Sequence, residues 1–184
     1  MSRSAEKLLI VNADDLGRTP GINSGIFEAH SNGLVTSATL MVAFPAAEEA
    51  ASRLDSHHHS HRQPVVCDAL VTSAREHDLP IRNASLEVGV RLRLDGVATT
   101  DFFVEDFFGG DARLDILIEI LGGIQLGTTE IMCHPAHVDD EVRSTSGYAD
   151  DRERELEVLT SPLALQAVRD LGLRPVHFGT AWQS

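Results

Sequence analysis

The clearest feature of the sequence is a run of four apolar residues, Leu8 to Val11, that stops abruptly at a polar group. Such a run is typical of a strand buried on both faces, as in a parallel sheet. The polar group that follows it contains Asn12, Asp14 and Asp15. A second stretch, residues 128–133, also predicts a buried strand, and it ends at His134. Two buried strands are therefore each expected to end in polar side chains.

Between these strands, the apolar positions alternate between strand and helix patterns. The chain opens as strand, helix, strand and helix at residues 7–11, 22–31, 35–42 and 46–54, an order that favours a parallel sheet. Further helices are predicted at residues 65–76, 111–121, 153–159 and 162–171, an extended piece at 79–82 and a closing strand at 175–178. Residues 86–94 alternate apolar and polar side chains, which favours a half-buried strand and leaves a helix as the alternative. The pattern as a whole indicates an α/β fold with a mainly parallel sheet.

The carboxyl ends of parallel strands share one edge of the sheet, and α/β proteins build their active sites there. We therefore expect Asp14, Asp15 and His134 to lie together at that edge. Adjacent carboxylates are costly to bury unless they are paired or bound to a metal. The alternative is that the two aspartates only form a turn and cap the next helix, which is common for this residue type.

A third polar group follows the second predicted helix, where four histidines lie between His57 and His61. One carboxylate with two neutral imidazoles is a familiar site for a divalent metal. A second carboxylate can take a proton from water on the metal, and a histidine can protonate a leaving group. Together these residue types suit metal-assisted hydrolysis of an amide or ester. Taken alone, the histidine run also fits a solvated loop.

Composition narrows the class of protein. A chain of 184 residues with 42% hydrophobic residues is expected to form one domain over residues 1–184. The net charge of −13 argues against nucleic acid and anionic membranes as partners, and it is compatible with a small-molecule or oligosaccharide substrate. The two cysteines, Cys67 and Cys133, are far apart and fit reduced thiols. No stretch approaches the length of a membrane span, and residues 1–7 carry no signal-peptide core, so a cytoplasmic location is expected.

Several motifs occur in an order that is found in one known family. They are LIVNADDLG at 9–17, GINSGIFEA at 21–29, GLVTSATLM at 33–41, DSHHHSH at 55–61, GVATTDF at 96–102, TEIMCHP at 129–135, and Tyr148 with residues 152–156. Through these motifs, nearly the whole chain resembles the YdjC-like (ChbG/HpnK) carbohydrate deacetylases. The resemblance implies a (β/α) barrel-like glycoside hydrolase/deacetylase fold and removal of acetyl groups from N-acetylated sugars.

The resemblance also implies roles for individual residues. It implies a divalent metal, usually Mg²⁺, with Zn²⁺ or Mn²⁺ as alternatives. Asp15 and His57 would bind this ion, and Asp14 would be the general base. His134 would lie by the substrate as an acid or an oxyanion partner. Further candidate site residues are Asn12, His59 and His61.

The chain departs from the family pattern between Leu54 and Asp55, which are joined directly. In the family, a Gly-aliphatic-His-aliphatic motif with a third ligand histidine lies between the second helix and the histidine run. Its absence predicts an incomplete barrel and a weakly held metal. It should also leave apolar residues in 35–42 exposed at an open sheet edge, which a homodimer would cover. Alternative functions are a catalytically impaired relative that binds sugar or a partner, and a metal-assisted hydrolase of another amide or ester.

Overall fold

The computed structural model describes residues 5–52 and 64–182. Its centre is a five-stranded sheet with the order β2-β1-β4-β3, while β5 also pairs with β1. The strands are β1 (Lys7–Leu16), β2 (Ser37–Leu40), β3 (Phe102–Val104), β4 (Gly127–Cys133) and β5 (Arg174–Pro175). Every strand pair is parallel, and within the described residues the sheet stays open between β2 and β3. The predicted parallel sheet and incomplete barrel are confirmed.

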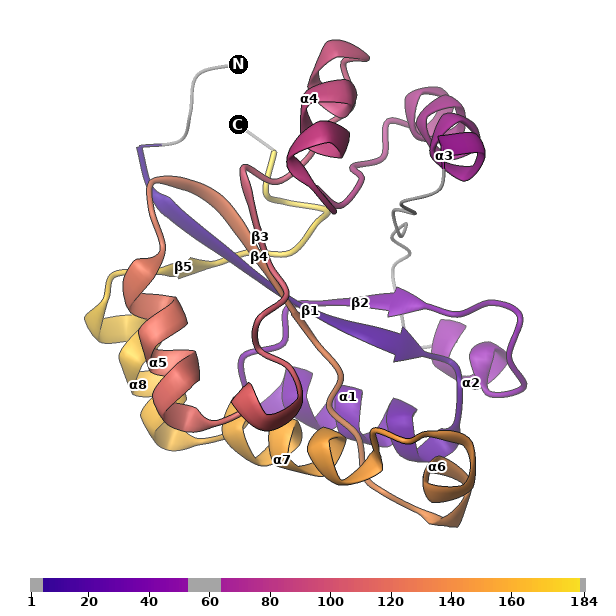
Figure 1. The fold of residues 1–184 in the computed structure, drawn as a ribbon, viewed down its shortest axis with the longest axis vertical. Coiled ribbons are helices and arrows are strands. Elements are labelled where there is room, and N and C mark those ends of the chain that lie inside the picture. The colour runs from indigo at the N-terminus through magenta and orange to yellow at the C-terminus, as the bar shows by residue number, and fades with distance from the viewer. Residues whose placement is uncertain (1–4, 53–63, 183–184) are drawn as a thin grey trace.

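The helices cover the sheet from two sides. They are α1 (Pro20–Asn32), α2 (Ala47–Ala51), α3 (Pro64–His77), α4 (Leu86–Leu94), α5 (Leu114–Gly123), α6 (Asp140–Thr145), α7 (Ala149–Leu159) and α8 (Pro162–Asp170), with a short 3₁₀ helix at Gly109–Asp111. Figure 1 shows α1, α5, α6, α7 and α8 along one side, and α3 with α4 on the other. In the described ranges, no helix has the length and apolar character needed to cross a bilayer.

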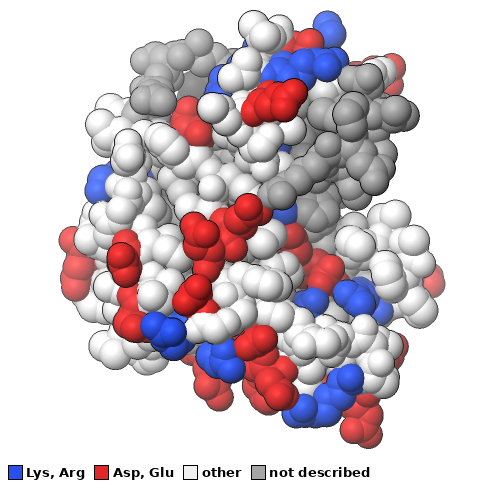
Figure 2. All heavy atoms as spheres, viewed as in Figure 1, with Lys and Arg blue, Asp and Glu red and all other residues white. Residues whose placement is uncertain are grey.

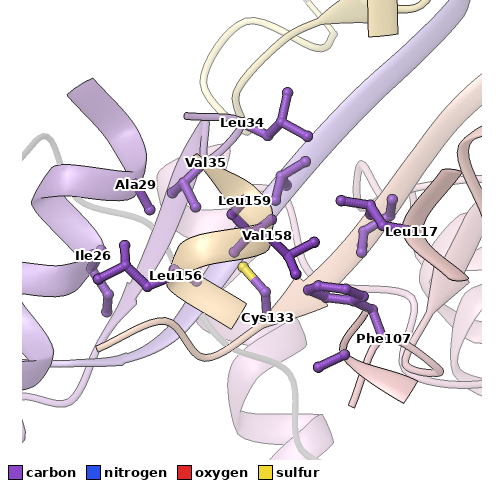
Figure 3. Packing of buried hydrophobic residues seen from close by; sticks show 14 of the residues in the cluster. Ile26, Ala29, Leu34, Val35, Phe107, Leu117, Cys133, Leu156, Val158 and Leu159 are labelled. Carbon is purple, nitrogen blue, oxygen red and sulfur yellow. The ribbon is translucent and has the colours of Figure 1, made fainter. Parts of the chain in front are cut away.

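Alternate residues of β1 join two different clusters. Leu9, Val11 and Ala13 pack into the main core, which also contains residues of α1, α5, α7 and α8. Figure 3 shows part of this core, with Phe107 and Leu117 beside the residues of α7. Leu8 and Ile10 face the other way and pack with Val176 and Phe178. The strand is therefore buried on both faces, as its apolar run predicted.

Residues 86–94 form a helix, so the favoured strand prediction was wrong and the alternative was right. The side chain of Ser85 caps this helix by accepting a hydrogen bond from the backbone N–H of Val88. Leu86 and Leu94 lie exposed at its two ends, while Leu92 is fully buried. The alternating pattern was misleading because Leu86 and Leu94, which are exposed at the ends of the helix, fall in register with the apolar positions of a strand.

The open edge at β2 exposes fewer apolar side chains than predicted. Val35 is buried in the main core, because residues 34 and 35 bond to the backbone of α7 and α1 before β2 begins. In β2 itself, Ser37 and Thr39 are buried and make hydrogen bonds through their side chains. Val42 is the exception, with 79% of its surface exposed. The prediction that apolar residues in 35–42 are exposed is therefore wrong for Val35 and right for Val42.

Candidate active site

Asp14, Asp15 and His134 lie at the same edge of the sheet, as predicted. The pairing of β1 with β4 places Ala13 opposite Cys133, so the next residues of both strands emerge side by side. The pairing of β1 with β2 becomes irregular between Ala13 and Leu16. Asp15 has a φ of 72°, a left-handed conformation that Asp tolerates better than most residues. Such an irregularity redirects side chains, which is how two consecutive aspartates both reach the site.

Asp14 is buried and held by several hydrogen bonds. Two guanidinium nitrogens of Arg82 donate to its two carboxylate oxygens, each at 2.8 Å. The amide of Asn12 donates to Oδ1 at 2.8 Å, and the hydroxyl of Thr39 donates to the same atom at 3.0 Å. Asn12 therefore belongs to the site as an orienting residue. Bidentate pairing with an arginine fixes the plane of a carboxylate as well as its position.

Arg82 connects Asp14 to a second buried carboxylate, Glu130, in the middle of β4. The Nε of Arg82 donates to Oε1 of Glu130 at 2.7 Å, and the guanidinium lies 4.9 Å from the ring centroid of Phe103. Burial by itself lowers the pKa of Arg82, but the charge of Glu130 and the hydrogen bond to Asp14 more than offset this and raise it. Burial raises the pKa of Glu130 to about 7, against the opposing effect of Arg82. Its Oε2 is buried and has no hydrogen-bond partner within residues 5–52 and 64–182.

This pKa shift predicts a pH-dependent stability. The ordinary pKa of Glu130 is 4.5, so between pH 4.5 and about 7 the folded chain holds a proton that the unfolded chain has released. The free energy of unfolding should therefore fall as the pH rises through this window, by up to about 3 kcal/mol from this group. Urea denaturation of the parent and Glu130→Gln at pH 5 and pH 8 should show that the parent loses stability relative to the variant.

Glu119, on α5, offers a matched control because its side chain is exposed. The free energy of unfolding of Glu119→Gln should change with pH in parallel with that of the parent. Identical pH profiles for the parent and Glu130→Gln would show that Glu130 is ionised alike in the folded and unfolded states.

Asp15 is bound by cationic side chains. Its Oδ2 accepts a hydrogen bond from Arg152 of α7 and lies 3.7 Å from NH1 of Arg18. In the part of the chain that the structure describes, no three His, Cys, Asp or Glu side chains come together in a way that could hold a metal ion. The predicted ligand His57, with His59 and His61, lies outside the described residues.

His134 lies beside a carboxylate and two aromatic rings. Its backbone N–H donates to the buried Glu155 of α7, and its Nδ1 lies 3.7 Å from Oε1 of the same residue. The hydroxyl of Tyr148 donates to Glu155 Oε1 at 2.6 Å. The imidazole makes edge contacts with the rings of Phe108 and Tyr148. Among the residues that the structure describes, the buried Nδ1 has no hydrogen-bond partner.

Sequence reasoning assigned no role to Arg82, Glu130 or Glu155. A usable signal existed for Glu130, because a charged residue in the centre of a buried strand requires a partner. Arg82 was expected only as the end of an extended piece, and it does lie in a segment without regular secondary structure. Its pairing with Asp14 joins residues 68 positions apart, which no local pattern reveals.

Comparison with known proteins places this site in a family. The family model of the YdjC-like proteins matches residues 8–54 and 52–170. The chain is 30% identical to a carbohydrate deacetylase of Geobacillus stearothermophilus, over 92% of this chain and 96% of that protein. It is 29% identical to a carbohydrate deacetylase of Thermoanaerobacter pseudethanolicus, over 89% of this chain and 95% of that protein.

A solved structure with the same fold belongs to an Enterococcus faecalis protein described as a cellobiose-phosphate cleavage protein. Its TM-score is 0.86 at 24% identity, covering 96% of this chain and 99% of that chain. The alignment with the Geobacillus protein runs over 239 positions and includes 92% of this chain, or about 169 of its 184 residues, so about 70 aligned positions of that relative have no counterpart here. The two matched stretches of the family model meet at residues 52–54, where the predicted deletion lies. The chain belongs to the YdjC-like protein family.

Proposed function

We propose that this chain is a metal-dependent carbohydrate deacetylase that removes acetyl groups from N-acetylated sugars. The observation that carries the proposal is the meeting of Asp14, Asp15 and His134 at one sheet edge in a chain of the YdjC-like family. Two curated relatives at 29% and 30% identity are carbohydrate deacetylases, which supports the same reaction here.

The proposed reaction is hydrolysis of the amide bond between the acetyl group and the sugar nitrogen. Asp14, fixed by Arg82, would take a proton from the attacking water while the water oxygen bonds to the acetyl carbon. When the C–N bond breaks, the sugar nitrogen takes a proton and leaves as an amine, and acetate is the second product. His134 would supply that proton or would stabilise the developing oxyanion, and its Nδ1 lies 3.7 Å from Oε1 of the buried Glu155.

The metal is part of the proposal, with Asp15 and His57 as its ligands. When bound, it would make the attacking water more acidic and polarise the acetyl carbonyl. The described residues alone do not form a metal site, since the carboxylate of Asp15 contacts Arg152 and Arg18. Asp14 and His134 alone therefore carry the proposed proton transfers among the described residues.

Metal binding is expected to be weak and to depend on Asp15. Isothermal titration of the parent with Mg²⁺, Mn²⁺ and Zn²⁺ should show binding that Asp15→Ala abolishes, because a carboxylate ligand is lost. Asp150→Ala is a suitable control, since the Asp150 side chain is 79% exposed and forms a surface ion pair with Arg143. Equal binding by the parent and Asp15→Ala would remove Asp15 from the ligand set.

A second candidate function is a shortened relative that binds N-acetylated sugar without hydrolysing it. The break between the two matched stretches of the family model at residues 52–54 favours it, because this is where the third ligand histidine of the family is expected. Incubation of the purified chain with short N-acetylglucosamine oligomers, followed by measurement of acetate and free amine, separates the two. Product formation supports the deacetylase, whereas sugar binding without product supports the second candidate.

A further inference from the structure

Phe108 is an unusually exposed aromatic side chain beside the proposed active site. It lies between β3 and α5, and 47% of its surface is exposed, while the neighbouring Phe107 is fully buried in the main core (Figure 3). An aromatic ring that stays exposed to water forgoes the free energy that burial of its apolar surface would provide, whereas an exposed polar side chain does not. A ring held open next to a candidate catalytic histidine is therefore a candidate binding surface.

Tyr148 covers one face of the Phe108 ring, and His134 contacts the ring at an edge. Tyr148 stacks on it with the ring centroids 4.3 Å apart and the planes 3° from parallel. The imidazole of His134 lies 5.5 Å from Phe108 and 5.7 Å from Tyr148, at angles of 74° and 76°. Because it is nearly equidistant from both rings, His134 lies beside the stack. Because Tyr148 takes one face of the Phe108 ring, a ligand that stacks on Phe108 would take the opposite face, near the imidazole.

The stack is fixed in position by the same carboxylate that contacts His134. The hydroxyl of Tyr148 donates to Glu155 at 2.6 Å and accepts a hydrogen bond from the backbone N–H of Gly109 at 2.7 Å. The backbone N–H of His134 donates to Glu155 as well. A rigid aromatic side chain can bind a ligand with little loss of conformational entropy. The distance between the open face of Phe108 and His134 is thus set by the fold.

The chemistry around this face suits a neutral sugar. The C–H groups of a pyranose ring are polarised positively and pack on the negative face of an aromatic ring, while the hydroxyls at its rim need polar partners. Glu105 and Asp106, both exposed, precede Phe108 in the chain. Figure 2 shows acidic side chains spread across the visible face of the molecule, which disfavours strongly anionic ligands.

We propose that the open face of Phe108 is a stacking platform for a pyranose ring of the N-acetylated sugar, with Tyr148 as its support. This inference rests on the proposed function for its choice of ligand. The platform would hold the sugar beside His134 and would act in binding, whereas Asp14 and His134 act in the chemical step. Phe108 is then a specificity-determining residue that selects substrates with a flat C–H face.

Direct binding tests the platform independently of turnover. Isothermal titration with the disaccharide of N-acetylglucosamine should show a Kd that rises about tenfold in Phe108→Ala and in Phe108→Leu, and little change in Phe108→Tyr. Phe108→Leu keeps an apolar side chain against Tyr148, so it guards against loss of the fold. Leu163→Ala, at a residue of α8 that is 62% exposed, is the control and should bind like the parent. Equal Kd values for the parent, Phe108→Ala and Phe108→Leu would overturn the platform, and so would a parent that does not bind the disaccharide.

Kinetic measurements then distinguish an effect of Phe108 on sugar binding from an effect on the chemical step. If the parent deacetylates the disaccharide, Phe108→Leu should raise KM by about tenfold with kcat nearly unchanged. Hydrolysis of p-nitrophenyl acetate, which has no sugar ring, should be the same in both proteins. Loss of both activities together would mean that Phe108 only orders the site, which contradicts the inference. A parent that binds the disaccharide through Phe108 but releases no acetate would refute the proposed deacetylase while leaving the platform intact.

Discussion

Replacing Arg82 by methionine should lower the free energy of unfolding by about 3–5 kcal/mol, because it leaves two buried carboxylates without their cation. Arg82 makes two hydrogen bonds to Asp14 and one to Glu130, and all three residues are almost completely buried. Methionine keeps an unbranched apolar stem but lacks the guanidinium, so both carboxylates lose their charge partner and its hydrogen bonds. Urea denaturation at pH 7, followed by circular dichroism, measures the change.

A double-mutant cycle separates the charge effect from lost packing. In a Glu130→Gln background, Arg82→Met should lower the free energy of unfolding clearly less than it does in the parent. The reason is that Glu130→Gln has already removed one of the two carboxylates that lose their cation. Arg113→Met is the matched surface control: Arg113 is half exposed and pairs with Asp115, so its loss should change stability by less than about 1 kcal/mol. Equal costs for Arg82→Met in both backgrounds would show that Glu130 does not share the cation.

The strands that position the site were predictable because they are buried on both faces. Residues 8–11 are a continuous apolar run, residues 128–133 include the β-branched Thr128, Thr129 and Ile131, and both stretches form strands of the parallel sheet. The polar residues at their carboxyl ends then follow from the geometry of a parallel sheet alone. That is why Asp14 and His134 could be placed together without knowledge of the rest of the fold.

The parts that escaped prediction depend on contacts between distant segments. Strand β3 is only three residues long, and β5 only two, so each is defined by its pairing partner more than by its own residues. The cap at Ser85 was a local signal for helix α4 that alternation of apolar residues outweighed. Arg82, Glu155 and Tyr148 gain their roles from partners that the tertiary fold brings to them. Side-chain networks of this kind leave only a weak trace in a single sequence.

Replacing His134 by alanine should reduce kcat for deacetylation of N-acetylglucosamine oligomers by about 10²–10⁴-fold if the imidazole is the acid that protonates the leaving amine. An amine leaves poorly without a proton, whereas p-nitrophenolate leaves readily. Hydrolysis of p-nitrophenyl acetate should therefore be affected far less in the same variant. If His134 instead stabilises the oxyanion, both substrates develop the same negative charge on the acetyl oxygen, and both rates should fall by a similar factor. The ratio of the two losses assigns the role.

His137 provides a control of the same residue type, three positions along the chain. Its Nε2 lies 2.7 Å from Glu28 on the exposed surface, away from Glu155 and the aromatic stack, so His137→Ala should retain the activity of the parent on both substrates. Full deacetylase activity in His134→Ala would exclude both roles and would leave Asp14, with Arg82, as the centre of the reaction.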